Sequence, residues 1–332
     1  MKGIRRVLKT FNFVENQRVQ LEIPRANIYE NLQLLLTGKI TLADGSDSGT
    51  VKPLGAAGLM ERIEWIVNSG NTTKSLRGDD LYQINAVDQQ GRNALVVPAS
   101  GDVQADTDIK ASVFLNFEMP RGKEEVTRQT FYNSFTGDPV RNSLLQMAIT
   151  FGNRESLFTG NDRTITFTGI KVDVIADREI IPMTERLRKQ LFLGNKETTS
   201  EKEVIQSTDE FKVELGVGNQ YKRVIILGIK AGVLDDTIVQ NIKIVRNGEE
   251  VLRNLTFAQQ KEANAKEYGI KSADLETGMA IVDFDPKNTM KDLESAVTAS
   301  SFDLILKVGA PSGTTKVRVI KQEITPPPTR FY

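Results

Sequence analysis

Three pairs of acidic residues are the side chains in this sequence whose types and spacing suit chemistry. They are Asp79-Asp80, Asp235-Asp236 and the more widely separated Glu118 and Asp285. Glycoside hydrolysis needs two carboxyl groups roughly 5–10 Å apart that face each other across a cleft. Adjacent residues of a strand or helix point in different directions, so neither adjacent pair can do this alone. We interpret all these acids as solvated side chains or helix caps.

The composition excludes most other catalytic groups. The 332 residues include no cysteine and no histidine, which rules out disulfides, thiolate zinc sites, cysteine nucleophiles and every histidine-based triad. Neither a P-loop signature nor a strand-linked GxGxxG occurs, so a phosphate-binding glycine loop is not predicted. Residues 44–49, DGSDSG, lack the ligand spacing of a calcium loop. We therefore expect a protein that is not an enzyme and that uses no cofactor and no metal.

The charge balance indicates association rather than nucleic-acid binding. There are 43 basic and 43 acidic residues, so the formal net charge is zero. A dedicated nucleic-acid binder would show a basic excess, whereas near-neutral surfaces associate readily. No apolar run reaches the roughly 18 residues of a membrane-spanning helix, and Met1–Thr10 lacks the apolar region of a signal peptide. We expect synthesis and folding in a cytoplasm.

The element around which the chain is organised lies at residues 61–85. Ile63, Trp65 and Val67 alternate as one face of a strand, which predicts that the single tryptophan is a core residue. Asn68-Ser69-Gly70 supplies turn chemistry, and a short helix is expected around residues 79–84. The pattern returns at residues 242–253, where Thr256 and Gln259 then have capping-box spacing ahead of a second helix.

Five strand-like stretches of the first half recur in the same order in the second half. A period this long predicts two similar domains, because solenoid units have only about 20–50 residues. The matched pairs are residues 29–35 with 221–227, 63–70 with 242–248, 116–121 with 283–287, 145–152 with 302–309 and 171–175 with 316–320.

Each repeat contains roughly eight short strands and long loops, which is typical of an antiparallel sandwich with Greek-key connections. The predicted fold class is therefore all-β, with two tandem eight-stranded antiparallel jelly rolls and short helical insertions. Between them, helical segments are expected at Thr184–Leu193 and from the capping box Ser200–Glu203. The predicted organisation is a basic N-terminal arm at 1–18, a first jelly roll at 19–181, a helical linker at 182–208, a second jelly roll at 209–325 and a proline-rich tail at 326–332.

The two ends of the chain carry the only candidate contact residues. Ile4, Val7 and Leu8 share one helical face, which suits a membrane surface or nucleic acid, although a solvated or subunit-docked terminus is the interpretation we favour. The tail is expected to be a stiff polyproline II segment that hooks into a neighbour through its aromatic end. The candidate residues are Lys2, Arg5, Arg6 and Lys9 in the arm, and Pro326, Pro327, Pro328, Phe331 and Tyr332 in the tail.

Taken together, the sequence resembles the double jelly-roll major capsid proteins of the adenovirus and tectivirus lineage. It is most similar in character to the small versions of membrane-containing bacteriophages, namely those of the corticovirus type and of the lipid-containing Flavobacterium phage. The resemblance covers residues 19–325 as pattern and order, without a catalytic-type signature motif. It is carried by residues 18–41 and 59–85 and by their partners at 221–233 and 242–268.

This resemblance implies a structural capsid protein. Three chains would form a trimer whose six upright barrels make a pseudo-hexagonal capsomer of an icosahedral shell, in contact with neighbouring capsomers and with penton or minor capsid proteins. The basic arm would lie near an internal membrane, and the protein would belong to a virion assembled in the host cytoplasm. Sequence-specific nucleic-acid binding is not implied.

Two other functions remain open from the sequence. A carbohydrate-binding or glycan-active double β-sandwich would need exposed aromatic residues on a concave face or paired carboxylates. A phage spike or minor vertex protein would differ from a major capsid protein only in its copy number per particle.

Overall fold

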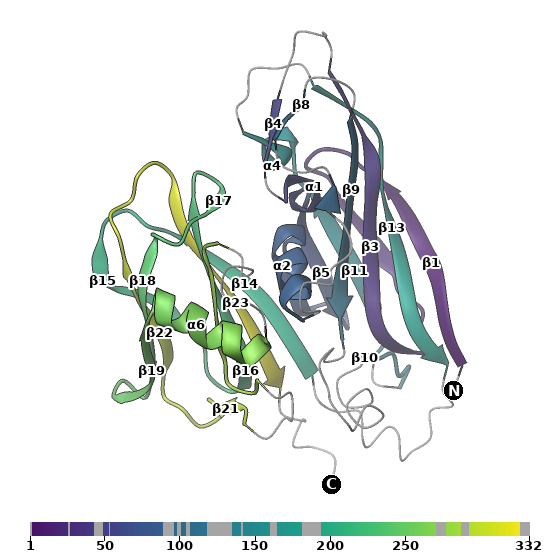
Figure 1. Ribbon diagram of the computed structural model, residues 1–332. Helices are drawn as coiled ribbons and strands as arrows, with labels where there is room; N and C mark the ends of the chain where they lie inside the picture. Colours follow the sequence, from purple (N-terminus) through teal and green to yellow (C-terminus); the bar gives the residue numbers. More distant parts are fainter. Residues whose placement is uncertain are drawn as a thin grey trace. The chain divides into compact units, whose positions relative to one another are not determined.

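The computed structural model describes residues 2–25, 27–42, 49–52, 54–88, 96–97, 101–103, 107–117, 135–140, 142–159, 165–180, 194–269, 277–286 and 292–325. The chain divides into two compact units, one containing the elements from β1 to β13 and the other those from β14 to β23 (Figure 1). Strands predominate in both units, and each unit is described by itself.

Unit 1 is built from two antiparallel sheets and a small third one. The first sheet has the order β1 (Lys2–Asn12), β13 (Ile165–Ile180), β3 (Ile28–Leu42), β9 (Thr107–Asn116) and β7 (Val96–Val97), with β10 (Phe135–Thr136) also paired to β3. The second has the order β6 (Asn71–Leu76), β5 (Met60–Val67), β11 (Leu145–Phe151) and β2 (Arg18–Glu22). The third joins β12 (Phe158–Thr159), β4 (Gly49–Val51) and β8 (Gly101–Val103).

Unit 2 repeats this plan with shorter strands. Its first sheet has the order β14 (Gly194–Glu203), β23 (Thr315–Thr325) and β16 (Gln220–Lys230), and the other edge of β16 pairs in turn with β21 (Glu294–Ser295), β20 (Met279–Asp283) and β17 (Val233–Leu234). Its second sheet has the order β15 (Thr208–Glu214), β22 (Phe302–Val308), β18 (Val239–Arg246) and β19 (Glu250–Thr256).

The order of the strands makes each unit a jelly roll. Among the eight principal strands of a unit, the first, eighth, third and sixth form one sheet, and the second, seventh, fourth and fifth form the other. This is the order that two Greek keys give. The predicted all-β double jelly roll is therefore confirmed. Four of the five repeated stretches lie on equivalent strands, namely β3 and β16, β5 and β18, β11 and β22, and β13 and β23. The stretches 116–121 and 283–287 begin at the last residues of the equivalent strands β9 and β20, and part of each lies outside the described residues.

One helix closes a side of each sandwich. Helix α2 (Gly78–Asp88) contacts β9 of one sheet and β5 of the other, and α6 (Phe257–Tyr268) contacts the equivalent strands β20 and β18. The predicted capping box of α6 is present, because Thr256 and Gln259 exchange side chain–backbone hydrogen bonds, and Gly269 ends the helix at a φ of 63°. Short helices α1 (Gly55–Gly58) and α4 (Arg154–Leu157) pack together in unit 1.

Each core is centred on three aromatic rings. Strand β3 of unit 1 directs Leu32, Leu34 and Leu36 into the sandwich, where all three are fully buried. In unit 1 the central ring is Trp65 of β5, whereas in unit 2 it comes from a different strand, β22, because the position equivalent to Trp65 holds Ile244. The ring contacts are Tyr29 and Phe117 with Trp65, and Tyr221 and Phe284 with Phe302.

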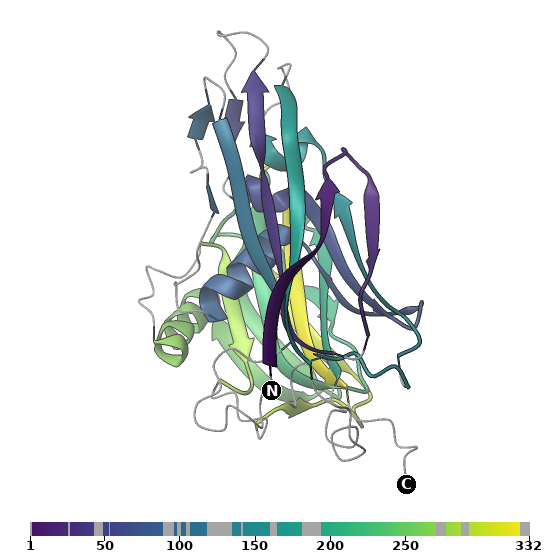
Figure 2. The same cartoon turned by 90° about the vertical axis from the view of Figure 1, so that its right-hand side faces the viewer.

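Two predictions about the segments outside the repeats are wrong. Residues 1–18 were expected to be an arm with a helical face, but Lys2–Asn12 is strand β1, which pairs with β13 at the edge of the first sheet (Figure 2). Ser200–Glu203 was expected to begin a helix in a helical linker at 182–208, but it ends strand β14. All ten residues of β14 pair with β23, and this pairing outweighs the local preference of the capping box for a helix. The helix predicted at Thr184–Leu193 lies outside the described residues.

Candidate functional site

The acidic pairs singled out from the sequence hold the fold together. Asp79 accepts hydrogen bonds from the Arg77 guanidinium and from the backbone N–H of Asp80, at 3.1 Å each. Asp80 itself is fully buried. Asp79-Asp80 thus belongs to the first turn of α2, as a helix N-terminus favours.

The second pair fixes the loop that precedes β18. Asp235 accepts from the backbone N–H and the hydroxyl of Thr237, and these hydrogen bonds lower the pKa of its carboxyl. Asp236 accepts from the Lys261 ammonium at 2.9 and 3.0 Å and from the backbone N–H of Gly278 at 2.6 Å. A shallow groove between this loop and the start of α6 is crossed by that ion pair.

The third pair does not form a described site. Asp285 is fully buried, and its backbone N–H donates to the carboxylate of Asp283, while Glu118 lies outside the described residues. Within the described ranges, no group of three or more acidic residues is placed to hold a metal ion. Among the helices of that part of the chain, none is long and apolar enough to cross a membrane.

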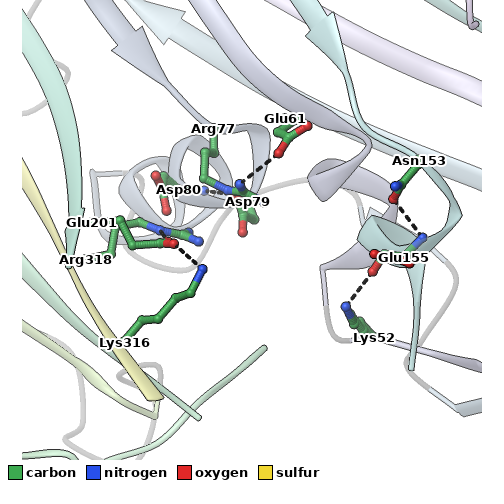
Figure 3. A network of polar contacts seen from close by, with 10 residues as sticks. All are labelled: Lys52, Glu61, Arg77, Asp79, Asp80, Asn153, Glu155, Glu201, Lys316 and Arg318. Carbon is green, nitrogen blue, oxygen red and sulfur yellow. Dashed lines mark hydrogen bonds and ion pairs between the residues drawn. The ribbon is translucent and has the colours of Figure 1, made fainter. Parts of the chain in front are cut away.

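Cations also brace the fold in unit 1 (Figure 3). The Lys52 ammonium donates to the backbone carbonyl of Glu155 at 2.5 Å, and Asn153 caps α4 by accepting from the Glu155 N–H at 3.0 Å. Burial lowers the pKa of Lys52, although nearby Glu155 acts in the opposite direction. Arg77 is 3.9 Å from Glu61 in addition to its contact with Asp79. These contacts join the segment before α1 to α4 and the start of α2 to β5.

Glu201 pairs with two cations on the neighbouring strand of unit 2 (Figure 3). Its carboxylate lies 2.7 Å from the Lys316 ammonium and 2.9 Å from the Arg318 guanidinium. Burial alone would raise the pKa of Glu201, but the hydrogen bond from Lys316 and the charge of Arg318 outweigh it, so that the pKa is lowered.

Replacing Glu201 should remove a pH-dependent part of the stability. A lowered folded-state pKa contributes stability that is present above the unfolded-state value and lost as the pH falls through the folded-state value. Because the side chain is 30% exposed, we expect Glu201→Gln to cost only about 1 kcal/mol at pH 7. The difference from the wild type should vanish in acid. Urea unfolding at several pH values measures this, with Glu203→Gln on the same strand as the control, and a pH-independent difference would contradict it.

The lone tryptophan does not fit a sugar platform. Trp65 is fully buried between Tyr29 and Phe117, as the strand pattern predicted. A sugar ring stacks on an exposed aromatic ring, so the buried Trp65 cannot bind a sugar in this way.

Hydrogen bonds, as well as strands, are duplicated between the units. Asn68 accepts from the backbone N–H and the hydroxyl of Ser143 at 2.8 and 3.1 Å, and Asn247 accepts from Ser300 in the same way and at the same two distances. Both asparagines have positive φ, 53° and 56°, which asparagine tolerates. The predicted turn after the organising strand thus also links two loops at one end of each jelly roll, a role that the serine positions did not reveal in the sequence.

A second duplicated contact fixes the helices to the sheets. Asn85 of α2 donates to the carbonyl of Phe114 at 2.9 Å and accepts from its N–H at 2.7 Å. Asn264 of α6 makes the same pair of hydrogen bonds to Ile281, at 2.6 and 2.8 Å. Each side-chain amide therefore imitates a neighbouring strand at the edge of β9 or β20.

The comparisons with known proteins agree with this duplicated plan. No protein-family model matches the sequence, and no curated protein matches it. Among solved structures, the major capsid protein of Sulfolobus turreted icosahedral virus superposes with a TM-score of 0.77 at 14% identity, covering 98% of this chain and 97% of that one. The major capsid protein of bacteriophage PM2 gives 0.64 at 10% identity, with all of both chains covered.

The chain has the fold of the double jelly-roll major capsid proteins. VP54 of the virus PBCV-1 also shares it, with a TM-score of 0.59 at 10% identity over 97% of this chain and 93% of that one. The fold was predicted correctly from the order of the repeated strands. At these identities the likeness concerns architecture, and it assigns no role to individual residues.

The predicted basic residues occupy an edge strand of this double jelly roll. Arg5 lies 3.2 Å from Asp177, its register partner on β13, and also donates to the side-chain amide of Gln33. Arg6 and Lys9 are exposed and lie opposite the buried residues Ala176 and Val174 of β13. A β-bulge separates Val7 from Lys9. Charges and a bulge on an edge strand prevent edge-to-edge pairing with other chains.

The described residues leave the two terminal predictions untested. The side chain of Lys2 and all of Pro326, Pro327, Pro328, Phe331 and Tyr332 lie outside what the structure describes. The tail contact with a neighbour and the membrane-proximal role of the first residues therefore stay predictions.

Proposed function

We propose that the protein is the structural major capsid protein of an icosahedral virus. The observation that supports this best is the match of the whole chain, with both jelly rolls in order, to the major capsid protein of Sulfolobus turreted icosahedral virus at a TM-score of 0.77. A partial match to one jelly roll would have been compatible with many β-sandwich functions. The acids considered for catalysis instead brace loops and helix ends, which supports a structural role.

The proposed assembly is a homotrimer that acts as a pseudo-hexagonal capsomer. Two jelly rolls of the same topology in one chain let three chains present six similar barrels, so a three-fold oligomer fits a hexagonal lattice. Capsomers would contact one another and the penton or minor capsid proteins of the particle. We place the shell over an internal membrane, with the start of the chain on the membrane side, and we place assembly in the host cytoplasm.

The solution mass of the purified protein tests the assembly. We expect a stable species of three times 36.9 kDa, about 111 kDa, because obligate subunit interfaces are large and largely apolar. Native mass spectrometry or light scattering gives the mass, and electron microscopy of the same sample should show hexagonal tiles. A monomer that persists at high protein concentration and under capsid assembly conditions would contradict the proposal.

A further inference from the structure

The turn between strands β18 and β19 carries the only Asn-Gly pair of the sequence, Asn247-Gly248. Both residues are exposed and have positive φ, 56° and 76°. An asparagine can lose its side-chain amide without an enzyme when the backbone nitrogen of the next residue attacks the amide carbon. Glycine permits this attack best, because it has no Cβ to hinder the approach and adopts the required backbone conformations freely. The turn therefore has the residue types that spontaneous deamidation needs.

The contacts of Asn247 polarise its side-chain carbonyl and leave the reacting nitrogens free. Its Oδ1 accepts from the backbone N–H and the hydroxyl of Ser300 at 2.8 and 3.1 Å. When a nucleophile adds to the amide carbon, negative charge develops on this oxygen, and two donors that are already in place stabilise it. Among the described residues, none accepts a hydrogen bond from Nδ2 of Asn247 or from the N–H of Gly248. Neither the leaving nor the attacking nitrogen is thus held by another group.

The equivalent turn of unit 1 has the same contacts but a different following residue. Asn68 has a φ of 53° and accepts from Ser143 at the same two distances. Both turns have the same length, so Ser69 occupies the position of Gly248. Ser69 has a φ of 64°, so the turn accommodates a serine there. The Cβ of Ser69 hinders the attack that Gly248 permits, and unit 1 therefore provides a natural comparison within the same chain.

We propose that Asn247 is a site of spontaneous deamidation and that Ser300 promotes the reaction by polarising the amide. The backbone nitrogen of Gly248 attacks Cγ of Asn247, and the bond from Cγ to Nδ2 breaks. The proton of the Gly248 N–H passes through solvent to Nδ2, which leaves as ammonia, and a cyclic succinimide remains. Water then adds to either carbonyl of the ring, which gives aspartate or isoaspartate. Water is the sole co-reactant, and no group is oxidised or reduced.

The products change unit 2 in a way that unit 1 does not share. Aspartate at position 247 keeps an acceptor for Ser300, and its charge strengthens those hydrogen bonds. Isoaspartate inserts a methylene group into the backbone of the turn and moves the free carboxylate onto the α-carbon, so that the link to Ser300 is lost. Either product adds a negative charge beside the exposed acids Glu249 and Glu250. The inference goes beyond the proposed capsid role, because it gives one of two equivalent loop links a limited chemical lifetime.

Peptide mass spectrometry of the purified full-length protein, incubated at mildly alkaline pH, tests the inference. The conversion of Asn247 and of Asn68 is followed in the same sample by the mass gain from amide to acid. We expect Asn247 to convert about tenfold faster than Asn68, a difference of about 1.4 kcal/mol in the barrier. Gly248→Ser should slow Asn247 to the rate of Asn68. No atom lies within 4 Å of the position that a Cβ would take at Gly248, so this variant should fold like the wild type.

Two further variants test the roles of the turn and of the serine. Ser69→Gly should raise the conversion of Asn68 to the rate of Asn247, and Ser300→Ala should slow Asn247 about threefold, because one donor to Oδ1 is lost. Faster conversion in Ser300→Ala would overturn the role of the serine, since a contact that only restrains the turn would protect the amide. The site itself is wrong if Asn247 keeps its amide as long as Asn68 does, or if Gly248→Ser leaves its rate unchanged. The capsid proposal is tested separately by the solution mass.

Discussion

Replacing Asn264 by alanine should destabilise unit 2 by about 2–4 kcal/mol. The side chain is fully buried and makes two hydrogen bonds to the backbone of Ile281, which is itself fully buried. After the substitution the Ile281 carbonyl keeps its hydrogen bond from Gln260 at 2.7 Å, but the Ile281 N–H loses its Asn264 partner in a buried position. An unsatisfied buried donor costs about 1–3 kcal/mol, and the lost contacts and cavity add to this.

Chemical denaturation measures the effect, with a matched asparagine as the control. Asn254 is exposed on β19 and contacts Asn241 at 2.9 Å, so Asn254→Ala should change the free energy of unfolding by less than about 0.5 kcal/mol. The equivalent substitution in unit 1, Asn85→Ala, should behave like Asn264→Ala. If Asn264→Ala were no more destabilising than Asn254→Ala, the duplicated amide would contribute nothing to holding the helix.

The duplicated asparagines also occupy open edges of two strands. Asn264 takes hydrogen-bonding groups of β20 that a further strand would otherwise use, and Asn85 does the same for β9 at Phe114, beyond the two residues that pair with β7. An open edge of this kind is a template for pairing with other chains. We therefore infer that these residues serve specificity as well as stability, because an occupied strand edge cannot pair with another chain.

The sequence predicted the parts of the fold whose local pattern agrees with their tertiary surroundings. Strand β11, Leu145–Phe151, lies within the strand-like stretch predicted at residues 145–152, because apolar side chains alternate on a half-buried sheet. Helix α6 was predicted because the capping box at Thr256 and Gln259 precedes a run of good helix-forming residues. The order of the repeated strands then sufficed for the double jelly roll, since the same topology had to accommodate both halves.

Strands β14 and β1 were missed because tertiary pairing overrides their local pattern. Strand β14, GNKETTSEKE, contains no large apolar residue, so it lacks the alternation that identifies a strand, and Ser200–Glu203 has the spacing of a capping box by coincidence. In β1, the bulge between Val7 and Lys9 breaks the two-residue period, and the apolar residues then fall at helix-like spacing. The pairing of β14 with β23 and of β1 with β13 cannot be recognised from the sequence of either segment alone.

For the basic residues near the start of the chain, the sequence predicted the kind of side chain but not its contacts. The sequence indicated that the basic residues near the start of the chain would be exposed, but it could not show that Arg5 is neutralised by Asp177 across a strand pair.

Replacing Gly78 by alanine should destabilise unit 1 strongly. Gly78 is the first residue of α2, and a Cβ there would lie 2.2 Å from the carbonyl oxygen of Ala57 and 3.1 Å from Cβ of Met60. The obstacle is mainly backbone, so no side-chain rotation relieves it, and α1 and α2 would have to separate. Overpacking costs about 1–3 kcal/mol even where side chains can adjust, so we expect about 3 kcal/mol or more.

The matched control is the glycine of the turn after β5. No atom lies within 4 Å of the position that a Cβ would take at Gly70, so Gly70→Ala should leave the free energy of unfolding within about 0.5 kcal/mol of the wild type. Denaturant unfolding and soluble yield distinguish the two variants. A Gly78→Ala protein as stable as the wild type would mean that the α1–α2 contact can shift at little cost. The opposite result would show that this contact is a rigid support, on which α2 can hold Asn85 against the edge of β9.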